Sequence, residues 1–192
     1  IGREMLIAST ISEASDTNLG TIGYKPTDPI HVKFTRIDTT IYLSQAVVPP
    51  VHDTNDPHMS KALGRSPLPP IMHAYPLVCY NRDSSAMVIE MTKFFSGDNE
   101  LLAPIKSTKG GVVNITGKFK SEGSVIDQIK SFEDNVTVKS YLSYSVTADL
   151  LGLMVIKKDE PMTVKVTRTA VEVSNEGDPV EIALCGRRVL VE

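Results

Sequence analysis

Hydrophobic and polar residues alternate along much of the chain, and this spacing predicts β-strands. Alternation at every second position places apolar side chains on one face of an extended strand and polar side chains on the other. Residues 31–37 and 41–47 alternate in this way across a short polar break, which is typical of a hairpin. The same pattern predicts a second hairpin and several single strands, at 3–11, 76–82, 86–91, 136–144, 150–156, 162–173 and 180–191.

Residues 124–132 instead have the spacing of an amphipathic helix. Ser124 suits the N-cap position, and Val125, Ile129 and Phe132 recur at positions i, i+4 and i+7. This spacing places the three apolar side chains on one face. The sequence therefore predicts one clear helix here, packed on a sheet.

A double phenylalanine follows the second predicted hairpin and indicates a short helical turn. Thr92 is a candidate cap for this turn, because its hydroxyl can accept a hydrogen bond from an orphan backbone N–H. Gly97 would end it in a left-handed conformation. We expect Phe94 and Phe95 to enter the core.

Residues 48–76 differ from the rest in composition, because they hold more than half of the chain's twelve prolines. Proline removes a backbone donor and is excluded from central strands. This composition predicts a long irregular loop with one helical turn at 59–63. Ordered loops of such length are often functional.

Strands outnumber helices in these predictions, and the regular strand–helix alternation of a parallel sheet is absent. We therefore predict an α+β fold that is strand-rich: mainly antiparallel sheet, one clear helix at about 124–132, and the long proline-rich loop at 48–76. Residues 1–192 are expected to form a single domain. The chain begins at Ile1 rather than Met, which favours a processed chain or part of a longer protein.

Composition and charge exclude two classes of function. The formal net charge is −3, and the densest basic clusters are the pairs at 157–158 and 187–188, so the chain lacks the basic stripe of a nucleic-acid-binding protein. No apolar run approaches the ~20 residues that span a bilayer as a helix. We expect neither nucleic-acid binding nor a membrane span.

Metal-binding chemistry has one candidate pair. His52 and His58 lie near two aspartates in the sequence HDTNDPH, and imidazole and carboxylate are ligand types that zinc accepts. The spacing is His-x5-His in a proline-bordered loop, with no helix to align the two rings. We expect a solvated polar loop and no metal site in this chain, with His52 and His58 as the residues to test.

Catalytic motifs are missing from the sequence. The His-Glu-x-x-His helix, the Gly-x-Ser-x-Gly elbow and the two glycine-rich phosphate-binding loops do not occur. Cys79 and Cys185 match no zinc or redox spacing, so a disulfide and two buried thiols both stay open. We therefore predict no catalytic residue and no cofactor-binding residue.

A resemblance adds to this interpretation. Residues 80–98 fit the pattern Tyr-Asn-x-Asp-Ser-x-Ala-x-Val-Ile-Asp-Val-Thr-x-Phe-Phe-x-Gly-Asp, with Glu90 where the pattern has its second aspartate. This pattern resembles that of a domain-of-unknown-function family found at the N-terminal side of secreted, metzincin-like zinc metallopeptidases of Gram-negative bacteria. Residues 125–145 and the opening of the chain are similar to the family in the same order. The matching positions are Tyr80, Asn81, Asp83, Ser84, Ala86, Val88, Ile89, Thr92, Phe94, Phe95, Gly97 and Asp98.

The resemblance implies a noncatalytic accessory domain that supports or covers a catalytic domain, or helps to present protein substrate. The expected partners are the catalytic domain of the same polypeptide and a protein substrate. Zinc would belong to the parent enzyme, and the location would be secreted, periplasmic or outer-membrane-associated. The 48–76 loop and the last forty residues depart from the family pattern.

Two alternatives stay open beside this interpretation. The chain could be an independent extracellular module that binds protein or glycan, although the absence of tryptophan weighs against glycans. It could also be a hydrolase whose acids, or whose Cys79, are brought together only by the fold.

Overall fold

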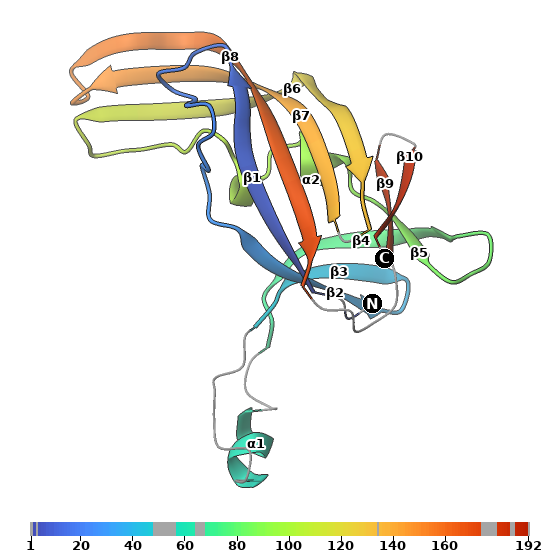
Figure 1. The fold of residues 1–192 in the computed structure, drawn as a ribbon. Coiled ribbons are helices and arrows are strands. Elements are labelled where there is room, and N and C mark those ends of the chain that lie inside the picture. The colour runs from blue at the N-terminus through green and yellow to red at the C-terminus, as the bar shows by residue number, and fades with distance from the viewer. Residues whose placement is uncertain are drawn as a thin grey trace.

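The computed structural model describes residues 2, 4–47, 57–63, 68–133, 135–173, 180–184 and 187–191. Ten strands lie in these residues and form one curled sheet (Figure 1). Their bounds are Glu4–Ala14 (β1), Ile30–Ile37 (β2), Thr40–Gln45 (β3), Ile71–Tyr80 (β4), Met87–Glu90 (β5), Val113–Ser131 (β6), Asn135–Leu150 (β7), Met154–Glu172 (β8), Val180–Leu184 (β9) and Arg187–Val191 (β10). The order across the sheet is β10-β9-β5-β4-β3-β2-β1-β8-β7-β6, and every neighbouring pair is antiparallel except β5 and β9.

The predicted α+β class is wrong, because the described residues are nearly all antiparallel sheet. The helix predicted at 124–132 lies within β6, which pairs with β7 along its length. A register shift just after Ile126 changes the face to which later residues point. Ile126 and Ile129 therefore both pack against the core, although they are three positions apart. Val125 and Phe132, which the helix would have buried, are 52% and 56% exposed.

Ser124 has a different role from the predicted helix cap. Its hydroxyl donates to the carbonyl oxygen of Lys120 at 2.7 Å and accepts from the backbone N–H of Ser143 at 2.9 Å. These bonds lie where the β6–β7 register shifts between Lys120 and Val125. Ser124 thus satisfies backbone groups at a bulge, where the ladder itself cannot pair them.

The other strand predictions are largely confirmed. The first hairpin is β2–β3 and the second is β4–β5, which closes where Asn81 N–H donates to Ala86 O at 2.9 Å. Every second residue at the start of β7 is buried, as the alternation predicts. The strand predicted at 150–156 is interrupted, because Leu153 N–H donates to Leu150 O in the turn between β7 and β8.

The predicted 48–76 loop is partly regular. Its last residues belong to β4, and helix α1, Pro57–Leu63, contains the predicted helical turn. Helix α1 lies apart from the sheet (Figure 1). Residues 48–56 and 64–67 lie outside the described part of the chain.

The core lies against one side of the curled sheet, where two short helices cover it. These are α2, Thr92–Ser96, and the 3-10 helix η1, Glu100–Leu102. As predicted, Phe94 and Phe95 are buried, at 2% and 1% exposure, and they pack with residues of β1 to β5 and β7. No helix in the described residues is long and apolar enough to cross a membrane.

Candidate functional site

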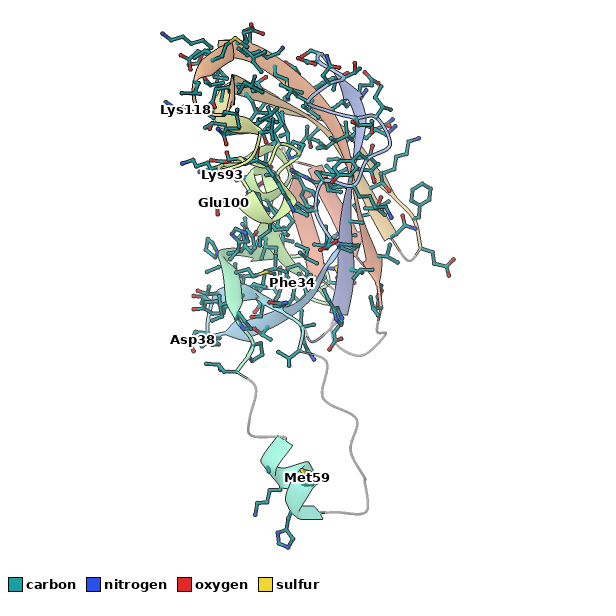
Figure 2. All side chains as sticks on the ribbon, turned by 90° about the vertical axis from the view of Figure 1, so that its left-hand side faces the viewer. Phe34, Asp38, Met59, Lys93, Glu100 and Lys118 are labelled. Atoms are coloured by element: carbon teal, nitrogen blue, oxygen red, sulfur yellow. The ribbon has the colours of Figure 1, made fainter. Side chains whose placement is uncertain are left out.

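A groove of about 940 Å³ lies beside α2. Its walls come from β4, from α2 with the residues around it, and from the middle of β6. Figure 2 shows Lys93 of α2 on the same side of the molecule as Lys118 of β6. The lining residues are His73, Ala74, Tyr75, Pro76, Glu90, Thr92, Lys93, Phe94, Ser96, Gly97, Asp98, Asn99, Phe119, Ser121 and Ser124. We refer to it as the α2 groove.

Helix α2 forms because its apolar residues are buried, and the predicted Thr92 cap is wrong. The N-cap residue is Met91, which makes no side-chain capping bond. Thr92 instead donates its backbone N–H to Glu90 Oε1 at 2.8 Å, and its hydroxyl also contacts that carboxylate. A carboxylate beside the first turn suits the positive end of the helix.

Gly97 ends α2 for a reason other than the predicted left-handed conformation. Its φ and ψ are −100° and −175°, which is extended backbone. Its N–H donates to Lys93 O at 2.8 Å, and a Cβ at Gly97 would lie 2.3 Å from that same oxygen. The chain therefore needs glycine here because of a close approach to the last turn of the helix.

Arg168 of β8 holds α2 and η1 on the sheet. Its side chain is 0% exposed, and its two Nη atoms donate to the carbonyl oxygens of Phe95 at 2.5 Å and Leu102 at 3.0 Å. Burial lowers the pKa of the guanidinium to about 10, so the group stays charged at neutral pH. None of the ion pairs between described residues includes Arg168, and carbonyl dipoles at the end of α2 stabilise its charge.

The β4 wall of the groove contains two polar atoms without a hydrogen-bond partner among the described residues, His73 Nε2 and Tyr75 Oη. The His73 ring packs edge-on against Phe94, with 5.4 Å between ring centroids. Burial lowers the pKa of His73 and raises the pKa of Tyr75, so both are neutral at pH 7. An unsatisfied buried polar group costs about 1–3 kcal/mol, so both atoms favour a bound partner.

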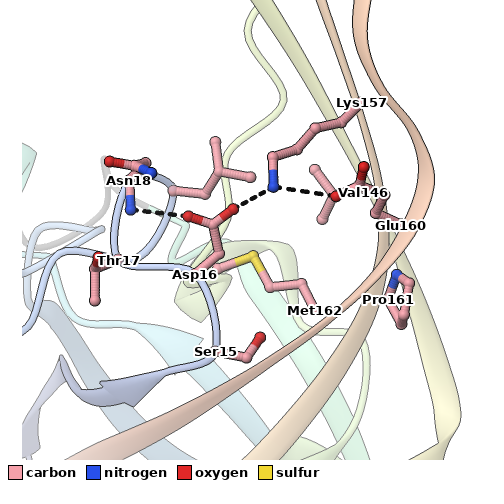
Figure 3. A pocket seen from close by; sticks show the side chains of 10 residues that line it. Ser15, Asp16, Thr17, Asn18, Val146, Lys157, Glu160, Pro161 and Met162 are labelled. Atoms are coloured by element: carbon pink, nitrogen blue, oxygen red, sulfur yellow. Dashed lines mark hydrogen bonds and ion pairs between the residues drawn. The ribbon is translucent and has the colours of Figure 1, made fainter.

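A second hollow, of about 420 Å³, lies where the loop after β1 meets β8 (Figure 3). Lys157 contacts Asp16 and is 3.1 Å from Glu160 Oε2, while the backbone N–H of Asn18 donates to Asp16 Oδ1 at 2.9 Å. The Lys157 bond and then the Asn18 bond lower the pKa of Asp16, and the bonds to Asp16 and Glu160 raise the pKa of Lys157. We refer to it as the ion-pair pocket, and its charges are already paired.

Of the two residues predicted as metal candidates, His58 lies on α1 and is exposed, while His52 lies outside the described residues. No group of three or more His, Cys, Asp or Glu side chains in the described part could hold a metal ion. Cys79 lies in β4 and Cys185 lies outside the described residues, so a disulfide and two thiols both stay open.

Sequence reasoning missed His73, Tyr75 and Arg168. His73 and Tyr75 fell in the predicted proline-rich loop, although their two-residue spacing is that of one strand face. Arg168 lies on the inward face of β8, the same face as the buried Val166 and Ala170. A single arginine among alternating apolar residues was the available signal.

Comparison with known proteins gives one match. The profile of a family described as a domain of unknown function, DUF5117, matches residues 26–175. No curated protein and no solved structure matches the chain significantly. The matched range runs from just before β2 to just beyond β8, and so includes every wall of the α2 groove and Arg168.

Proposed function

The chain belongs to the DUF5117 family of domains of unknown function, and from this premise we propose that it is a noncatalytic accessory domain of a secreted zinc-dependent metallopeptidase. The link to peptidases rests on the resemblance of residues 80–98 described above. The domain would support or cover the catalytic domain of the same polypeptide, or help to present protein substrate to it. Zinc would be held by that catalytic domain.

The observation that carries this proposal is the use of the polar side chains in and around the α2 groove. Arg168 binds carbonyl groups of the fold, and Glu90 binds Thr92. His73 has a ring contact with Phe94 and no hydrogen bond to an acid or a hydroxyl among the described residues. General acid–base or nucleophilic catalysis needs two such groups within hydrogen-bond reach. This arrangement favours binding over chemistry.

The test compares the 192-residue chain with the protein made from the longest natural reading frame that contains it. Each is purified and assayed for bound zinc and for casein cleavage. We expect zinc and cleavage only in the longer protein, which should encode a His-Glu-x-x-His helix after this domain. Stoichiometric zinc in the 192-residue chain, or a natural stop soon after Glu192, would contradict the proposal.

An independent extracellular binding module is the second candidate, and the size of the groove favours it. Ligand pockets are about 300–1,000 Å³, and Tyr75, Phe94 and Phe119 give the α2 groove aromatic walls. Protein and glycan arrays probed with the chain should then show saturable binding that groove substitutions abolish. Clean negative arrays would remove this alternative.

A further inference from the structure

Strand β4 has an open edge where it borders the α2 groove. Residues 71–76 of β4 pair with β3 on one side, in a register that places Thr40 opposite Pro76. On the other side β5 pairs only from Leu77 onward. In the described residues, therefore, the first half of β4 has a strand neighbour on one side alone. The chain leaves β5 to form α2, and this departure leaves the edge open.

The direction of the backbone groups on this edge follows from one hydrogen bond. Leu77 N–H donates to Thr39 O at 2.8 Å, so the backbone groups of Leu77 point toward β3. Successive residues of a strand point their N–H and C=O groups to opposite sides. The N–H and C=O of Ala74 therefore point away from β3, toward the open side. The C=O of Pro76 faces Glu90 of β5 instead, because Leu77 and Ile89 are a non-hydrogen-bonded pair and the ladder bonds form at the residues on either side of them.

Pro76 fits this geometry. A proline has no N–H and is confined to edge strands or to positions whose N–H would face away from a partner. At Pro76 the missing N–H is on the side away from β3, so β4 keeps its pairing with β3. Between His73 and Pro76 the edge thus offers one donor and one acceptor, both at Ala74.

The α2 groove runs along this edge. Four consecutive residues of β4, from His73 to Pro76, line it, including the exposed Ala74 and Pro76. Lys93 of α2 and Ser121 of β6 lie on other walls. One wall of the groove is thus an open strand edge. An extended polypeptide can bind to such an edge as an added strand, because its backbone offers donors and acceptors that pair with those of the edge.

We propose that an extended segment of a protein substrate binds in the α2 groove by pairing with the open edge of β4 at Ala74. This inference rests on the proposed function for the identity of the partner, which is the polypeptide delivered to the peptidase. The segment donates to the carbonyl of Ala74 and accepts from its N–H. His73 and Tyr75, on either side of Ala74, line the same groove.

The test uses one protein in two states, native lactalbumin and its reduced, carboxymethylated form, which is permanently unfolded. Binding of each to the purified chain is measured by fluorescence anisotropy. We expect saturable binding of the unfolded form and at least tenfold weaker binding of the folded form, since only an extended segment can pair with β4. Equal binding of both forms, or binding of neither, would overturn the inference. This first test needs only the wild-type chain.

The matched variants are Ala74→Pro, which removes the single donor of the edge, and Ala74→Val, which keeps it. Proline is tolerated at a strand position whose N–H faces away from the partner, so the fold should persist, and far-UV circular dichroism checks this. Ala74→Pro should weaken binding of the unfolded protein at least tenfold, and Ala74→Val by less than twofold. Equal weakening by both variants would point to a side-chain effect and overturn strand addition.

The outcomes separate this inference from the proposed function. If the longer protein holds zinc and cleaves casein while the chain binds no unfolded protein, only the groove inference fails. If the chain binds unfolded protein through Ala74 while no longer reading frame encodes a peptidase, only the peptidase link fails.

Discussion

The two hollows of this domain differ in how their polar groups are satisfied. In the ion-pair pocket, Lys157 lies between two carboxylates and Asp16 also accepts a backbone N–H, so the fold itself provides the partners. In the α2 groove, His73 Nε2 and Tyr75 Oη have no partner among the described residues. Buried polar groups are normally paired. This difference fits our proposal that another molecule binds in the groove, whereas the polar groups of the pocket bind one another.

The strongest way to break this comparison is to remove the buried anchor of α2, the helix beside the groove. Phe95 is 1% exposed, and Phe95→Ala should lower the free energy of unfolding by about 3–5 kcal/mol, because it leaves a cavity under α2. Urea unfolding followed by circular dichroism measures this. Phe132→Ala is the control: Phe132 is 56% exposed, and its loss should change stability by no more than about 0.5 kcal/mol. Equal losses would contradict the burial of Phe95 and the exposure of Phe132.

Removing Arg168 should have the next largest effect. Arg168→Met leaves the buried carbonyls of Phe95 and Leu102 without their donor, while it relieves the desolvation of a buried charge. We expect the free energy of unfolding to fall by about 2 kcal/mol. Binding of unfolded protein should also weaken, because α2 loses its anchor. The exposed Lys158→Met is the control for loss of a positive charge. A variant as stable as the wild type would contradict the role of Arg168.

A smaller effect is expected at Gly97, where the helix ends. Gly97→Ala places a Cβ against Lys93 O and should cost about 1–2 kcal/mol, because backbone must shift. At Gly111 the nearest atom to an added Cβ would be 3.6 Å away. Gly111→Ala should therefore change the free energy of unfolding by only a few tenths of a kcal/mol. Thermal unfolding of the two variants gives the comparison. Similar melting temperatures would show that Gly97 is not constrained.

The smallest effect is expected in the ion-pair pocket. Bonds from Lys157 and Asn18 lower the pKa of Asp16, so this carboxylate stabilises the fold above its unfolded value of 3.8 and loses that effect as the pH falls through its folded pKa. Asp16→Asn should lower the melting temperature by about 2 °C or less at pH 7. The difference from the wild type should vanish as the pH falls below 3.8. Binding of unfolded protein should not change, and a change would erase the contrast between the two hollows.

Local alternation was enough to predict most strands, because each strand buries one face and exposes the other. It failed at 124–132, where Val125, Ile129 and Phe132 have the spacing of a helix but a bulge in β6 turns Ile126 and Ile129 to the core. A bulge depends on pairing with β7, and nothing within the segment itself reveals it. The predicted fold class was wrong for this one reason.

The candidate site was harder to predict because its walls come from distant parts of the sequence. The proline content predicted no strand at 71–76, yet the nitrogen of Pro76 faces away from β3, so the pairing with β3 needs no N–H there. Which side of β4 is open depends on where β5 turns into α2. The burial of Arg168 likewise depends on β8 lying under α2, which no local pattern shows.

The most direct measurement is hydrogen–deuterium exchange of the wild-type chain, alone and saturated with reduced, carboxymethylated lactalbumin. Strand addition predicts slower exchange at Ala74 and at α2, with no change at residues 15–19 or 157–162 of the ion-pair pocket. Slower exchange in the ion-pair pocket, or at the exposed turn between β7 and β8, with none at β4, would contradict this account of the groove.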